Sequence, residues 1–221
     1  MSQNKPVIVT GATRHWPALA RWSDPAYLDR TAGGADCTVS FSRDGYGDAP
    51  HDGLFVKPQE RTLPLRELLA RLADARAGRG RTDCGEGVPY LSAQNDSLRR
   101  ELSALLPDCA DGLRWASAAL GREPEATNIW ARLTLCPLSS ARVRGRRRQA
   151  HGFTPQPAPP QIGDERSVSS FHKDHYENLY SVICGEKIFT LLPPTDGWRL
   201  YPTLMPAGAR RGGALNPAHG F

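Results

Sequence analysis

The sequence lacks long apolar runs and paired cysteine motifs, and both absences narrow the class of protein. No apolar stretch in the 221 residues approaches the length of a membrane-spanning helix. The apolar segment near the start, residues 7–10, is too short for a secretory signal core. The five cysteines form no CxxC pair, so free or buried thiols are expected instead of a zinc knuckle or disulfides. We therefore expect a cytoplasmic protein with no membrane partner, and a nuclear location stays open.

Acidic residues are absent from one segment, residues 131–161. This segment holds six of the 28 lysines and arginines and five of the 19 prolines, so the rest of the chain has 22 basic against 23 acidic residues. The net charge of +5 therefore belongs to this segment and does not describe the surface of the folded part. Its composition is typical of an irregular insertion. RGRRR within it could be a nuclear-localisation or nucleic-acid patch, but aromatic interleaving is missing, so a nucleic-acid partner is not expected.

Hydrophobic patterns elsewhere predict short strands and a few helices. A leucine stripe with i, i+3, i+4, i+7 spacing makes residues 63–75 the clearest helix. Further helices are predicted within residues 10–22 and at residues 98–106, the latter ended by Pro107. Strands are predicted at residues 5–10, 37–42 and 88–92. This mixture indicates an α+β or mainly-β fold with a helical N-terminal part.

Two candidate metal ligands lie in a segment that reads as a β-hairpin over residues 171–192. Gly185 and Glu186 would form its two-residue turn, with glycine at the first turn position. His172 and Asp174 are two residues apart, so on a strand they project from the same face and can chelate one divalent ion. A His-x-Asp pair forms two thirds of the facial triad of non-haem Fe(II) oxygenases.

Lys187 would lie on the same face as these ligands. A two-residue turn pairs Cys184 with Lys187, and Cys184 has the parity of His172 and Asp174 along the strand. A lysine inside a barrel is unfavourable unless it meets an anion. The 5-carboxylate of 2-oxoglutarate would be such an anion. An ordinary edge-strand lysine and surface histidines remain the alternative interpretation.

The segment SSFHKDHYENLYSVICGEKIFTLLPPTD resembles the iron-binding hairpin of JmjC-domain 2-oxoglutarate oxygenases. The resemblance covers residues 5–130 and 162–203, and it includes KPVIVTGATRHWPALARW, SRDGYGDA, VPYLSAQNDSL and WASAALGREPEATNIW. It implies a double-stranded β-helix (a cupin-like jelly roll), Fe(II), and 2-oxoglutarate as co-substrate. By position, His172 and Asp174 resemble the first two iron ligands, and Lys187 resembles the partner of the 5-carboxylate. The residues Ser169, Tyr90 and Asn178 resemble the hydroxyl, phenol and amide near the co-substrate.

The resemblance further implies a lysyl hydroxylase that acts on a protein, with a GTP-binding protein of the developmentally regulated family as partner. A metal-dependent peptidase at the same site is one alternative, although no His-Glu-x-x-His helix supports it. The other alternative is a non-catalytic cupin-like fragment.

The chain departs from the family pattern in two places. Family members carry a second histidine on a later strand, whereas only His219 remains here, without a predicted strand around it. We therefore expect a jelly roll that is incomplete, lacks its third ligand and exposes an apolar face. Residues 131–161 interrupt the family pattern, and removing them would join Trp130 to Ile162 in a continuous strand, so a retained intron is our hypothesis. The expected organisation is an N-terminal part of the JmjC-type domain (1–130), the insertion (131–161), the metal-binding hairpin (162–203) and an irregular tail (204–221).

Overall fold

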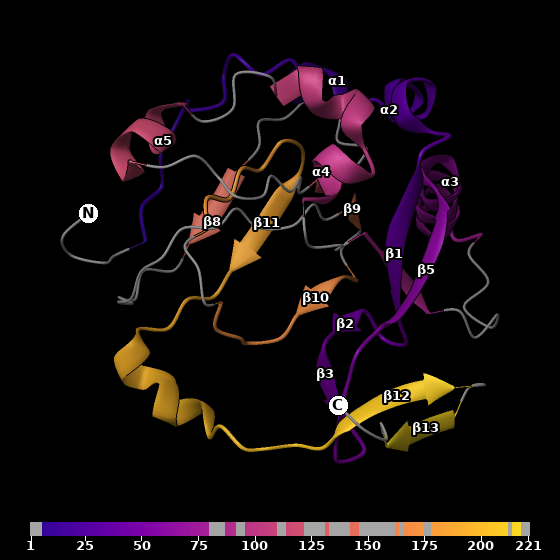
Figure 1. Ribbon diagram of the computed structural model, residues 1–221, viewed down its shortest axis with the longest axis vertical. Coiled ribbons are helices and arrows are strands. Elements are labelled where there is room, and N and C mark those ends of the chain that lie inside the picture. Colours follow the sequence, from indigo (N-terminus) through magenta and orange to yellow (C-terminus); the bar gives the residue numbers. More distant parts are fainter. Residues whose placement is uncertain are drawn as a thin grey trace.

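The structure is a computed structural model of the chain (Figure 1). It describes residues 6–79, 87–91, 96–109, 114–121, 131–132, 142–145, 162–163, 166–174, 178–211 and 214–217. The helical elements are α1 (Ala18–Arg21), α2 (Pro25–Ala32), α3 (Leu65–Arg76), α4 (Ser97–Arg100), η2 (Ser103–Cys109), α5 (Arg114–Leu120) and η3 (Pro194–Leu200). The first strands are β1 (Asp36–Ser42), β2 (Tyr46–Gly47), β3 (Ala49–His51), β4 (Leu54–Val56), β5 (Gln59–Pro64) and β6 (Val88–Tyr90). The later strands are β7 (Ala131–Arg132), β8 (Arg142–Gly145), β9 (Ile162–Gly163), β10 (Val168–Ser169), β11 (Glu186–Phe189), β12 (Ala207–Arg211) and β13 (Ala214–Pro217).

The main core lies between helix α3 and an antiparallel sheet of order β5-β1-β6. The leucine stripe of α3 is buried as its spacing predicts, and its members are Leu65, Leu68, Leu69 and Leu72. The predicted strand at residues 37–42 is confirmed as β1, and the predicted strand at residues 88–92 is confirmed as β6. Pro64 is both the last residue of β5 and the N-cap of α3, so strand and helix join without a loop. Figure 1 shows β1, β5 and α3 side by side.

A buried carboxylate joins η2 to the first two helices. The Asp108 side chain accepts hydrogen bonds from Arg21 Nη1 at 2.6 Å, Trp22 Nε1 at 2.7 Å and Tyr27 Oη at 2.8 Å. Asp108 and Trp22 are each 1% exposed. Because every donor here comes from more than 80 residues away in sequence, this carboxylate fixes long-range packing.

Two sequence predictions in the N-terminal part are wrong. Residues 7–9 were expected in a buried strand, but they form no strand, and Val7 is 77% exposed. An apolar run predicts burial only if a partner strand covers it, and none does so among the described residues. Pro107 was expected to end a helix over residues 98–106. Instead, the chain forms α4 and then η2, with Pro107 inside the 3₁₀ turns of η2.

The segment 131–161 leaves and re-enters the fold at neighbouring positions. Strands β7 and β9 pair in parallel, with Ala131 opposite Ile162, and Ile162 also bridges to Leu91 beyond the end of β6. The segment was expected to be irregular, but it contains β7 and also β8, which pairs in parallel with β11. Its other residues lie outside the described part.

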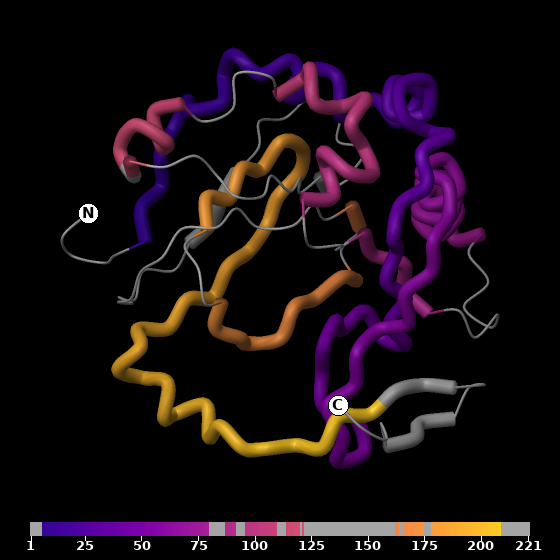
Figure 2. The backbone as a smooth tube through the Cα atoms, in the orientation of Figure 1, coloured from indigo at the N-terminus to yellow at the C-terminus, as the bar shows by residue number. Residues whose placement is uncertain are grey.

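The predicted hairpin over residues 171–192 is present only in part. Gly185 has a positive φ of 80°, as a tight turn requires of this position, and β11 follows it directly. The first arm is not a strand in its described residues, 171–174 and 178–184, and the partner of β11 is β8 instead. The chain nevertheless reverses direction before β11 (Figure 2). The rings of Tyr180 and Phe189 meet edge to face at 4.7 Å between centroids.

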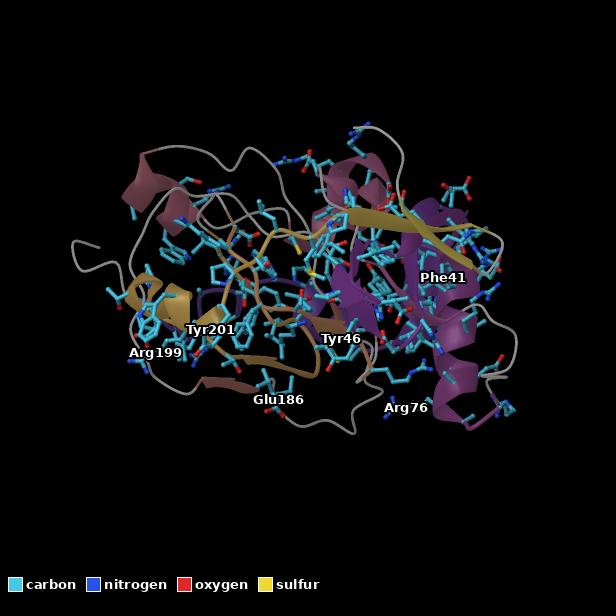
Figure 3. All side chains as sticks on the ribbon, turned by 90° about the horizontal axis from the view of Figure 1, so that it is seen from below. Phe41, Tyr46, Arg76, Glu186, Arg199 and Tyr201 are labelled. Carbon is cyan, nitrogen blue, oxygen red and sulfur yellow. The ribbon has the colours of Figure 1, made fainter. Side chains whose placement is uncertain are left out.

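The C-terminal part contains more strand than its composition indicates. The tail, residues 204–221, was expected to be irregular, but β12 and β13 pair antiparallel, and β12 also pairs with β4. Several apolar side chains are exposed on β11 and between β11 and β12: Ile188, Trp198, Tyr201 and Leu204. Figure 3 shows Tyr201 at the opposite end of the molecule from Phe41. In the part of the chain that the structure describes, no helix is long and apolar enough to cross a bilayer.

Candidate metal and co-substrate site

A turn-rich loop pairs with β10, the strand that precedes the candidate metal ligands. Strand β2 pairs in parallel with β10, so that Tyr46 lies opposite Val168 and Gly47 opposite Ser169. The backbone amide of Val168 donates to the carbonyl of Gly45 at 2.9 Å. The segment SRDGYGDA therefore fixes the chain immediately before His172.

His172 and Asp174 lie together, although their segment is not the strand that the prediction assumed. His172 Nε2 stands 3.6 Å from Asp174 Oδ1, and their side chains are 59% and 41% exposed. His172 Nδ1 donates to the carbonyl of Ser170 at 2.8 Å, because a carbonyl can only accept. Asn178 Nδ2 donates to Asp174 Oδ2 at 2.8 Å. His172 Nδ1 and Asp174 Oδ2 are thus each hydrogen-bonded to a neighbour, and the remaining atoms, His172 Nε2 and Asp174 Oδ1, face one another.

This arrangement fits a divalent metal ion. In a neutral imidazole with its proton on Nδ1, Nε2 carries a lone pair, and that lone pair faces a carboxylate oxygen. Two ligands about 2.1 Å from a metal and at right angles stand about 3.0 Å apart, so the observed gap needs only a small inward movement. The Ser170 carbonyl and the Asn178 amide are outer partners of the kind that orient metal ligands. An exposed imidazolium–carboxylate pair is the alternative, but 3.6 Å is too long for a hydrogen bond.

The third ligand is not found within the described residues. They contain no group of three or more His, Cys, Asp or Glu side chains that could hold a metal ion. His219 lies outside them, although β13 ends at Pro217, so a strand does precede this histidine, contrary to expectation.

Tyr90, Ser169 and Tyr180 form a second cluster from distant parts of the sequence. The phenol of Tyr90, on β6, is hydrogen-bonded to the side chain of Ser169, on β10. Burial raises the pKa of Tyr90 well above its ordinary value, the nearby phenol of Tyr180 raises it further, and the hydrogen bond with Ser169 opposes this rise. Burial also raises the pKa of Tyr180. Both phenols are therefore neutral at physiological pH and can act as hydrogen-bond donors.

Gly163 and Ser167 form the wall beside this cluster. A Cβ atom at Gly163 would stand 2.5 Å from Tyr90 Cδ2 and 2.7 Å from Ser167 Oγ, so only glycine lets the ring lie here. Ser167 Oγ is buried and has no hydrogen-bond partner among the described residues. A buried hydroxyl of this kind, beside a neutral phenol and a serine, suits a ligand with carboxylate oxygens.

Lys187 was expected to share a face with the metal ligands, and this stays a prediction because their segment is not a strand. It is half-buried on β11, and Phe189 lies two residues further along the same strand face. The Phe189 ring contacts the Tyr180 ring, and the Tyr180 phenol raises the pKa of Tyr90. The predicted pairing of Cys184 with Lys187 is not formed, because the described residues 178–184 are not a strand and β11 pairs with β8.

Replacing Tyr90 by phenylalanine tests the burial of its phenol. In the folded chain, we expect the tyrosinate absorbance that develops between pH 9 and 11 to be unchanged, because Tyr90 does not ionise there. In urea, the same substitution should remove one tyrosine titration near pH 10. The unfolded chain releases the Tyr90 proton at a lower pH than the folded chain does. The free energy of unfolding of the unsubstituted chain should therefore fall as the pH rises above about 10. A smaller absorbance change in the folded variant would contradict the assignment.

Comparison with known proteins decides the family. Residues 1–217 match the model of the cupin-like domain. The chain belongs to the cupin-like family. Its mixture of helices and antiparallel sheets agrees with the α+β jelly-roll class that the sequence predicts.

This cupin-like chain is similar to JmjC-domain proteins, the family that the sequence motifs resemble. It is 38% identical over 193 residues to the human bifunctional peptidase and (3S)-lysyl hydroxylase JMJD7, covering 87% of the chain and 49% of that protein. It is 36% identical over 211 residues to the Arabidopsis thaliana lysine-specific demethylase JMJ32, covering 94% and 50%. It is 32% identical over 219 residues to the Dictyostelium discoideum JmjC domain-containing protein E, covering 95% and 52%. The chain thus spans about half the length of these relatives.

The structure brings His172, Asp174 and Asn178 together and, separately, Tyr90 and Ser169, whereas the predicted place of Lys187 beside them stays a prediction. Asn178 contacts Asp174, a role that the sequence did not suggest. Sequence reasoning missed Ser167, Ser170 and Tyr180. Ser170 acts through its backbone carbonyl, and the other two act through tertiary neighbours, so none of them carries a motif of its own.

Proposed function

We propose that this cupin-like chain provides the Fe(II)- and 2-oxoglutarate-binding part of a dioxygenase that hydroxylates a lysyl side chain of a protein. The observation that carries the proposal is the facing pair His172 Nε2 and Asp174 Oδ1, each oriented by an outer hydrogen bond. Bound Fe(II) would supply oxidation of a C–H bond with dioxygen and 2-oxoglutarate as co-substrates. The similarity to a lysyl hydroxylase supports the substrate class.

The roles of the chain's own residues follow from their places. His172 and Asp174 would hold the metal. The neutral phenol of Tyr90, with the hydroxyl of Ser169, would donate hydrogen bonds to the co-substrate, and the Lys187 ammonium would pair with its 5-carboxylate. We keep a GTP-binding protein of the developmentally regulated family as the candidate substrate and the cytoplasm as the location.

Product analysis with a charge-reversal variant tests the proposal. In a form of the protein that carries a third metal ligand, incubation with Fe(II), 2-oxoglutarate and a lysine-containing protein should give a gain of 16 Da on lysine that requires 2-oxoglutarate. Lys187→Glu should reduce co-substrate binding by about 2 kcal/mol or more, because it removes the partner of a carboxylate. Lys57→Glu is the matched control, since Lys57 is exposed and lies outside the site.

Each other outcome selects a different function. A cleaved product that forms without 2-oxoglutarate favours the peptidase alternative. Loss of a methyl group from methylated lysine favours demethylation, the activity in the name of the Arabidopsis relative. A folded chain that yields no product and binds no metal is a non-catalytic cupin-like module.

A further inference from the structure

We propose that Ser170 is the positioning residue for the His172 imidazole, and that residues 44–48, the positioning loop, are its support. The inference rests on the proposed function in treating His172 as a metal ligand. The orientation of the ring, however, can be measured without a metal.

The positioning loop is itself fixed at several points. The Asp44 Oδ1 atom accepts the backbone amide of Tyr46 at 3.1 Å, which closes the turn. The loop then holds β10 through the β2–β10 pairing and through the hydrogen bond from Val168 N to Gly45 O. Gly45 has a φ of 90°, and a Cβ atom there would stand 1.8 Å from the Arg166 carbonyl oxygen. Only glycine therefore permits this close approach of loop and strand.

Ser170 connects this loop to the candidate ligand. Its hydroxyl donates to the carbonyl of Asp48 at 2.8 Å, and its own carbonyl accepts from His172 Nδ1 at 2.8 Å. Because both groups belong to one residue, anchoring the hydroxyl restricts the direction of the carbonyl. The carbonyl in turn selects the imidazole tautomer with its proton on Nδ1 and directs Nε2 toward Asp174.

Nitrogen NMR of the imidazole rings tests this relay in the metal-free full chain at pH 8.5, where histidines of ordinary pKa are neutral. We expect a protonated Nδ1 on His172 in the unsubstituted chain, and a mixture of tautomers in Ser170→Ala. Ser170→Thr keeps the hydroxyl and should restore the signature. Ser23→Ala removes a comparable exposed hydroxyl-to-carbonyl bond, Ser23 Oγ to Ala20 O, and should change nothing. An unchanged His172 spectrum in Ser170→Ala would overturn the proposal.

A glycine pair tests the positioning loop. Gly45→Ala and Gly53→Ala both place alanine at a positive φ, 90° and 78°, but open space surrounds a Cβ atom at Gly53. Only Gly45→Ala should displace β10, give mixed His172 tautomers and weaken Co(II) binding about tenfold, as Ser170→Ala should. Equal effects of the two substitutions would contradict a role for the Gly45 contact.

The two readouts separate the two proposals. If the unsubstituted chain does not bind Co(II), the proposed function fails, while the NMR comparison still decides whether Ser170 positions the ring. If Co(II) binds and the tautomer of His172 does not depend on Ser170, the positioning role fails and the metal site stands.

Discussion

Asp108→Asn is expected to lower the free energy of unfolding by about 3 kcal/mol, because it leaves buried donors without an acceptor. Asparagine keeps the shape of aspartate but replaces one acceptor oxygen with an NH₂ group. That group would face donors from Trp22, Tyr27 or Arg21, which held a carboxylate at 2.6–2.8 Å. The loss of negative charge also removes the partner of Arg21. Urea denaturation monitored by tryptophan fluorescence measures the change.

Asp74→Asn is the matched control for this substitution. Asp74 makes an exposed ion pair with Arg79 at 3.1 Å. Exposed pairs contribute little, so the loss should stay below about 0.5 kcal/mol. Similar destabilisation by both substitutions would show that the Asp108 contacts do not hold the helices together.

His172→Ala is expected to weaken binding of Co(II), used as a spectroscopic substitute for Fe(II), by at least about 100-fold. Loss of an outer partner alone typically weakens metal binding 10- to 100-fold, and this substitution removes a direct ligand. The measurement is a titration followed by the visible absorption of bound Co(II), with circular dichroism to confirm that the variant is folded. The substitution lies on an exposed side chain, so little stability should be lost.

His15→Ala provides the comparison for that experiment. His15 is exposed and lies before α1, with its ring 6.4 Å from the Trp16 ring. Its removal should leave Co(II) affinity unchanged. Affinity that falls equally in both variants would indicate non-specific histidine binding, and affinity that survives His172→Ala would rule out the facing pair as the metal site.

Local patterns predicted the parts of the fold that local forces determine. The leucine spacing gave α3 and its buried face, and the His-x-Asp spacing brought His172 and Asp174 together. The glycine at position 185 indicated a turn, which its positive φ confirms. In each case, the decisive interaction lies within a few residues of sequence.

The rest depends on partners that the sequence does not place. The apolar residues 7–9 looked like a buried strand, yet burial requires a neighbouring strand at the right distance. The predicted hairpin is not formed, because β11 pairs with β8 instead of with residues 171–184. Strand β8 has four residues and lies in a basic segment whose sequence shows no strand periodicity. The role of Ser170 depends on a carbonyl of residue 48, 122 positions away, and backbone acceptors leave no trace in side-chain patterns.

Because β5 and α3 join directly at Pro64, the direction of the buried face of α3 is tied to the register of β5. With no loop between β5 and α3, one inserted residue would turn the leucine stripe by about 100° around the helix axis. If the helix instead kept its packing, the insertion would shift β5 by one residue and exchange its two faces. Since β5 pairs with β1 and β1 with β6, the error would propagate across three strands to Tyr90. The position of Tyr90 thus depends on the number of residues at a junction far from it in sequence.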